Sequence, residues 1–268
     1  MIVMEKIQIA SAISPVRKLE TGKGTVGRAT LWIENGRIGG YLKLLDLDGI
    51  VKESLCWALA RYLGLPIPQA YYVFVNQEVL PPKLKLGNPF CLAFGSEEIN
   101  FPLDRIQNRR LVEDMLIKWK FSLECGVFDE WIINRDRIPN NLLYSSNEEF
   151  LLIDHDEALP AYASSNSHSV SGILETLGAR ITHAERQALY KRSEFFIKRI
   201  SKIDWEKIIA MVVVENVSEI RQDLFLKHVE LLKRRSQILS TVVSTGLGIS
   251  QVELLSGNEI DEKKEKHS

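Results

Sequence analysis

Hydrophobic and polar positions follow different periodicities along the chain, and the N-terminal part has a pattern typical of β-strands. In the first part, short apolar runs alternate with turn residues, and Asn35-Gly36 between two such runs is a strong hairpin signal. Residues 49–63 then carry apolar side chains at helical spacing, and Gly64 predicts the end of that helix. The segment 69–80 is rich in Tyr, Val and Phe, which predicts a strand.

The second half of the chain is dominated by helical spacing. A Pro- and Gly-rich passage contains FCLAFGS, residues 90–96, which predicts a short extended piece leading into a turn. Residues 103–125 predict one amphipathic helix, and 128–154 predict two strand-like runs on either side of a short polar loop. Almost every segment within 173–245 has helical spacing.

These elements predict an α+β fold with three parts. We expect a β-rich N-terminal lobe over 1–90, a mainly α-helical lobe over 91–250, and a charged, disordered tail over 251–268.

Composition excludes several classes of protein. The chain has 34 basic and 35 acidic residues, so its net charge of −1 implies no general attraction to nucleic acid or anionic lipid. Its three cysteines are widely spaced, which argues against a disulfide framework or a zinc site. Without a run of 18 apolar residues or a secretory signal, we expect no membrane span and a cytoplasmic location.

The polar loop carries the clearest chemical signal. Asp154 directly follows the apolar run 150–153, where a carboxylate is costly unless a partner such as a metal ion pairs with it. Asp136 and Asn141 are five residues apart, the spacing of the protein-kinase catalytic loop, which also precedes a hairpin and a metal-binding aspartate. The alternative is a surface turn rich in Asp and Asn that performs no chemistry.

Three features upstream of the loop fit nucleotide binding when they are taken in order. Gly22, Gly24 and Gly27 lie in a turn whose backbone N–H groups can approach a phosphate, although the pattern is also that of a flexible turn. Lys43 follows 16 residues after Gly27 and can reach back to the phosphates, unless it lies on the solvent face of its strand. Glu53, in the next helix, can hold that lysine, or it can be an acid that stabilises a helix N-terminus.

Four segments give the chain a resemblance to the HipA-like kinase family, and more distantly to phosphatidylinositol 3- and 4-kinases. They are YLKLL, KESLCWALARYLGLPIPQAYYVFV, FDEWIINRDRIPNNLL and FLLIDHDEAL, and the last two are the specific ones. The resemblance covers roughly residues 15 to 160. It implies a two-lobed protein-kinase-like fold, ATP with Mg²⁺, and transfer of the γ-phosphoryl group to a hydroxyl.

The resemblance also implies roles for individual residues. Lys43 would bind phosphate, Asp136 would be the catalytic base, and the metal ligands would be Asn141 and Asp154. The nucleotide-binding residues implied are Gly22, Gly24, Thr25, Gly27, Lys43, Glu53 and Phe94. Phe94 lies in LAFGS, residues 92–96, where an adenine would take backbone hydrogen bonds; the alternative is a buried strand end.

The best-studied branch of the family acts in toxin–antitoxin systems, which implies a serine or threonine of a protein as substrate and a separate antitoxin or regulatory protein as partner. No direct binding of nucleic acid is expected, because no aromatic ladder is present. In that branch a hydroxyl of the glycine turn is autophosphorylated, and Thr21 and Thr25 are the hydroxyls here.

One departure from the family pattern favours a different interpretation. Ile138 stands where the family has a histidine, two residues after the expected catalytic aspartate. This supports a nucleotide-binding pseudokinase that acts as an interaction module. A kinase for a small molecule or a lipid headgroup is a third hypothesis.

Overall fold

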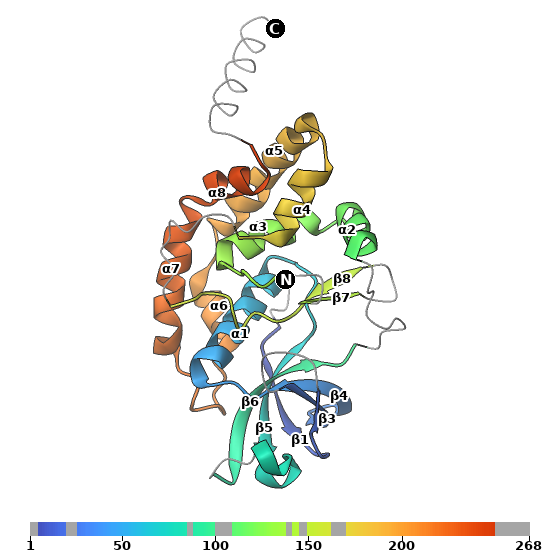
Figure 1. Cartoon of the computed structure of the whole chain (residues 1–268). Helices are drawn as coiled ribbons and strands as arrows, with labels where there is room; N and C mark the ends of the chain where they lie inside the picture. The colour runs from blue at the N-terminus through green and yellow to red at the C-terminus, as the bar shows by residue number, and fades with distance from the viewer. Residues whose placement is uncertain are drawn as a thin grey trace, which may run out of the picture. The chain divides into compact units, whose positions relative to one another are not determined.

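The chain consists of two compact units in a computed structural model, each assembled from separate stretches of the sequence (Figure 1). The structure describes residues 5–19, 26–84, 88–99, 109–137, 141–144, 149–161 and 170–249. The first unit comprises Met1–Asp104, Leu142–Asp156 and Asp204–Val229. The second comprises Arg105–Asn141, Glu157–Ile203 and Glu230–Ser268. The sequence-based boundaries near residues 90 and 250 stay predictions.

The first unit contains a six-stranded sheet. Its strands are β1 (Gln8–Ala12), β2 (Arg17–Lys18), β3 (Val26–Ile33), β4 (Gly36–Lys43), β5 (Ala70–Asn76) and β6 (Phe90–Glu97). The order is β1-β5-β6-β4-β3-β2, and because β1 also pairs with β3, the sheet closes in the manner of a barrel. Among the strand pairings of the described residues in this sheet, β1–β5 is parallel and the others are antiparallel. The apolar interior includes Leu31, Leu42 and Val73, all less than 1% exposed.

The hairpin predicted at Asn35-Gly36 is confirmed. Strands β3 and β4 pair in antiparallel register up to Ile33 opposite Gly36. Gly36 has a φ of 130°, a conformation that side chains with a Cβ rarely adopt, so glycine is required at this position. The hairpin brings the end of β4, and with it Lys43, to the start of β3 at Val26.

Helix α1 (Leu47–Tyr62) follows β4 and confirms the helix predicted over 49–63. The Asp46 side chain accepts the backbone N–H of Gly49 at 2.8 Å, which caps the helix N-terminus. Gly64 at φ 71° follows the helix C-terminus. The remaining elements of this unit are β7 (Leu142–Tyr144), β8 (Phe150–Leu152), α6 (Trp205–Val212) and the 3-10 helices η1 (Gln77–Val79), η2 (Pro82–Leu84) and η4 (Gln222–Phe225).

The second unit is helical. It contains α2 (Arg109–Lys118), α3 (Ser122–Ile132), α4 (Gly172–Arg180), α5 (His183–Ile200) and α8 (Leu239–Gly246), and α7 (Leu226–Ser236) begins in the first unit and ends in the second. Helix α3 packs against α4, α5 and α8. The helical content predicted for 173–245 is confirmed.

Two predictions about the segment before the polar loop are wrong. The single helix expected over 103–125 is interrupted, because α2 ends at Lys118 and α3 begins at Ser122; residues 103–108 lie outside the described ones. The strand-like run that begins at Phe128 is the second half of α3. All residues of α3 except Glu124 are buried, and a helix buried on every side produces the same unbroken apolar run as a buried strand.

The extended piece predicted at FCLAFGS is present but longer than expected. It belongs to the eight-residue strand β6, and Gly95 and Ser96 lie inside the strand rather than in a turn. Within the part of the chain that the structure describes, no helix combines the length and the apolar character needed to cross a membrane.

Candidate active site

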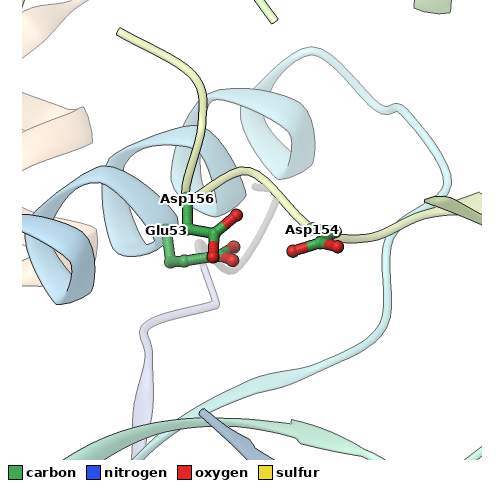
Figure 2. A group of neighbouring side chains, drawn as sticks. All are labelled: Glu53, Asp154 and Asp156. Carbon is green, nitrogen blue, oxygen red and sulfur yellow. The ribbon is translucent and has the colours of Figure 1, made fainter. Parts of the chain in front are cut away.

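The first unit gathers one lysine and three carboxylates at the end of β4. The three carboxylates are drawn in Figure 2. Lys43 Nζ donates hydrogen bonds to Glu53 Oε1 and Asp154 Oδ1, and it lies 4.0 Å from Asp156 Oδ1. Figure 2 shows Glu53 projecting from α1, with Asp154 and Asp156 on the segment that follows β8. The lysine therefore bridges the sheet, a helix and a loop of the same unit.

Backbone contacts fix where these carboxylates lie. The Leu152 N–H of β8 donates to the Pro66 carbonyl at 2.8 Å, which ties the segment before Asp154 to the chain just beyond α1. The His155 N–H then donates to Glu53 Oε1 at 3.1 Å, and the ring Nδ1 of His155 lies 3.6 Å from Glu53 Oε2. Asp154 has a φ of 65°, a left-handed conformation that aspartate adopts more readily than most residues.

Burial and ion pairing act against each other in this cluster. Burial by itself would raise the pKa of the Glu53 carboxyl, but the charge of Lys43 and the contacts of His155 outweigh it and lower that pKa to about 2. Burial disfavours the Lys43 ammonium, yet Glu53 and Asp154 raise its pKa above the usual value. Both groups are thus charged at neutral pH, and Glu53 is almost fully buried.

Asp156 is a member of the cluster that sequence reasoning missed. Burial raises the pKa of the Asp156 carboxyl to about 6. The charges of Asp154 and Glu53 act in the same direction, and the charge of Lys43 acts against them. One oxygen from each of the three carboxylates lies within 4.8 Å of the others. The sequence signal for Asp156 is its place two residues after Asp154, on the same short segment that follows β8.

A second group of predicted residues lies in the second unit. The Asn141 side-chain amide donates to the Asp136 carbonyl at 2.6 Å and to Asp136 Oδ2 at 3.1 Å. The Asp136 N–H in turn donates to Asn134 Oδ1 at 3.2 Å. Asp136 is half-buried and Asn141 is buried. Asp136 and Asn141 are therefore neighbours, while Asp154 belongs to the other unit.

The positions of the other predicted nucleotide-binding residues give no direct indication of nucleotide binding. Gly27 lies in β3, and a Cβ there would come within 2.3 Å of Val16 Cγ1, so close packing by itself accounts for a glycine. Phe94 is a buried residue of β6 whose backbone is in register with Lys43 of β4. The glycine-turn residues Thr21, Gly22, Gly24 and Thr25, and also Ile138, lie outside the described residues.

Comparison with known proteins agrees with this architecture. A family model described as HipA-like kinase matches residues 43–226. The crystal structure of the proinflammatory kinase CtkA of Helicobacter pylori superimposes with a TM-score of 0.53, covering 89% of this chain and 98% of that chain at 13% sequence identity. No match was found among curated proteins. The expected α+β, kinase-like fold is confirmed.

Proposed function

This chain belongs to the HipA-like kinase family, and from that premise we propose that it uses ATP and Mg²⁺ to phosphorylate a serine or threonine hydroxyl of a protein. The observation that carries the proposal is Lys43, held by Glu53 from α1 and by Asp154 beyond β8. A strand lysine paired with a helix glutamate is the arrangement that protein kinases use to hold ATP phosphates. Here the strand is β4 and the helix is α1.

The residues of the cluster fit a divalent cation. Three carboxylates and one ammonium leave a formal charge of −2 when all four groups are ionised, and a divalent cation would balance it. Carboxylate oxygens are the ligands that Mg²⁺ prefers. On the basis of the family resemblance, we propose Asp154 and Asn141 as its protein ligands. When bound, the metal would neutralise charge on the phosphates during transfer.

Asp136 is the proposed base. Its carboxylate is partly exposed and would accept the proton of the attacking hydroxyl. The Asn141 amide donates to this carboxylate and so restricts its orientation. Lys43 would bind the phosphates, with Glu53 keeping its ammonium in place. A separate antitoxin or regulatory partner and a cytoplasmic location are parts of the same proposal, and family membership supports them.

A pseudokinase is the second candidate, favoured by Ile138 in place of the family histidine. Both functions require nucleotide binding, but only the kinase requires Asp136 as a base. The two are therefore separated by measuring binding and transfer on the same variants.

The experiment compares the wild-type protein with Asp136→Asn and Asp154→Asn. Calorimetry with ATP, with and without Mg²⁺, measures binding, and intact-mass spectrometry with a radiolabelled ATP assay measures phosphoryl transfer. We expect metal-dependent binding in the wild type and in Asp136→Asn, weaker binding in Asp154→Asn, and transfer only in the wild type. Binding without transfer would support the pseudokinase, and no binding at millimolar Mg-ATP would refute both.

A further inference from the structure

One buried carboxylate at the end of α3 holds two residues of the polar loop. Asp129 is fully buried, and its carboxylate accepts Arg137 Nε at 3.0 Å and 3.2 Å through its two oxygens. The same carboxylate accepts the Asn134 side-chain amide at 3.4 Å. The Asn134 backbone N–H also donates to the Asp129 carbonyl at 2.9 Å, so Asn134 is bound to Asp129 twice.

Arg137 and Asn134, which Asp129 binds, each form a hydrogen bond with the backbone of one of the two proposed functional residues. Arg137 Nη1 donates to the Asn141 carbonyl at 2.6 Å. Asn134 Oδ1 accepts the Asp136 N–H at 3.2 Å. The Asn141 amide donates to Asp136. These hydrogen bonds form a closed circuit of five residues, Asp129, Asn134, Asp136, Arg137 and Asn141. Asp129 is thus one step removed from both residues.

The physical setting makes this circuit rigid. The side chains of Asp129 and Arg137 have no exposed surface, so water does not compete for their hydrogen bonds. A guanidinium carries five donors in a fixed plane, which allows Arg137 to bond Asp129 and Asn141 at the same time. A lysine has a single nitrogen and does not reproduce this fork. A buried ion pair is a poor source of stability, so its value lies in the geometry that it imposes.

We propose that Asp129 and Arg137 are a positioning pair that sets where Asp136 and Asn141 point for phosphoryl transfer. Neither residue is assigned a contact with substrate or metal. The inference rests on the proposed function, because it needs Asp136 and Asn141 to act in the reaction. Asn134 is the second arm of the same device.

The test uses two variants that weaken the circuit without removing its central charge. Arg137→Lys keeps the positive charge opposite Asp129 but loses the fork, and Asn134→Ala removes the acceptor of the Asp136 N–H. The control is Val127→Ala, a buried α3 position outside the circuit. Each protein is assayed at the same number of degrees below its own melting temperature, so that differences in stability do not affect the comparison. We measure the rate of phosphoryl transfer from Mg-ATP, the affinity for ATP without metal, and hydrogen exchange of peptides spanning residues 134–144.

We expect both circuit variants to lose about 10- to 100-fold in transfer rate, the usual effect of removing a group that orients a functional residue. Their affinity for metal-free ATP should stay unchanged, and exchange in 134–144 should rise. Val127→Ala should keep the wild-type rate and exchange pattern. The proposal is overturned if the circuit variants behave like Val127→Ala in either measurement.

The experiment also separates this inference from the proposed function. If Asp136→Asn transfers phosphate at the wild-type rate, the proposed function fails whatever the circuit variants do. If Asp136→Asn is inactive while Arg137→Lys and Asn134→Ala are fully active, the positioning pair alone fails. The exchange measurement needs no turnover, and unchanged exchange in both variants counts against the pair in every case.

Discussion

Replacing Lys43 by methionine should destabilise the first unit strongly, because it removes the ammonium from a buried carboxylate. The pKa of Glu53 is lowered from 4.5 to about 2, although burial acts to raise it, and Lys43 is the largest of the causes that lower it. Lowering this pKa from 4.5 to about 2 contributes on the order of 3 kcal/mol to the unfolding free energy at neutral pH, and Lys43 together with His155 supplies that contribution. Breaking buried ion pairs typically costs about 3–5 kcal/mol, which agrees.

The pH dependence of this loss follows from the direction of the Glu53 shift. A carboxyl whose folded-state pKa is depressed contributes stability above its unfolded pKa, and the contribution is lost as the pH falls through the folded value. For Glu53 that window runs from about pH 4.5 down to about pH 2. The difference in stability between wild type and Lys43→Met should therefore be largest at pH 7 and should shrink below about pH 4.5.

The assay is urea unfolding followed by tryptophan fluorescence at pH 7 and pH 4, with calorimetry for the melting temperature. About 3 kcal/mol corresponds to a melting temperature about 6–12 °C lower. Adding Glu53→Gln to Lys43→Met should recover part of the loss, because the unpaired buried charge is removed. The control is Lys207→Met, whose partner Asp204 lies 2.8 Å away on the surface and whose loss should be barely measurable. The reasoning is refuted if Lys43→Met melts within about 2 °C of wild type at pH 7.

Three further outcomes are expected. Asp154→Asn should weaken ATP binding in calorimetry with Mg²⁺ while leaving metal-free binding unchanged, and equal losses in both would contradict a metal role. Burial lowers the pKa of His228, although the charge of Asp48 acts to raise it. The unfolded chain therefore binds a proton at this histidine at a higher pH than the folded protein does. Stability should fall as the pH drops below about 6.5, and His228→Gln should flatten that slope in urea titrations. Gly178→Ala should lower the melting temperature although alanine favours helix, because its Cβ would lie 2.8 Å from the Leu247 carbonyl oxygen; a higher melting temperature would show that the contact relaxes.

The features that could be predicted from the sequence are those set by short-range signals. The hairpin at Gly36 follows from local turn chemistry, and α1 follows from apolar spacing bounded by Asp46 and Gly64. Once a strand, a turn and a helix are placed in order, Lys43 and Glu53 come close together with little further information. Their ion pair needs only ten residues of chain.

The features that could not be predicted depend on long-range packing. The run from Phe128 has the pattern of a strand because full burial removes the polar face by which a helix is recognised. No local pattern predicts the place of Asp156 in the cluster, because its neighbours Lys43 and Glu53 are more than a hundred residues away in the chain. The ion pair of Asp129 with Arg137 becomes visible only after α3 is placed, because α3 ends at Ile132, between the two residues, and no single periodic element contains both.

A few residues of this fold have backbone conformations that cost stability. Among the described residues, Ile133, Asp154 and Leu159 are the non-glycine residues with positive φ. A β-branched residue such as Ile133 at φ 56° is a marked exception, and each such residue costs on the order of 1–3 kcal/mol unless its surroundings hold it in place. Ile133 ends α3 immediately before the Asn134 arm of the circuit, and Asp154 is itself the carboxylate bonded to Lys43. Asp154 is thus a residue proposed for chemistry that itself has a strained backbone, and Ile133 directly precedes Asn134, which helps to position Asp136; both fit a fold in which the position of functional groups is kept at a cost in stability.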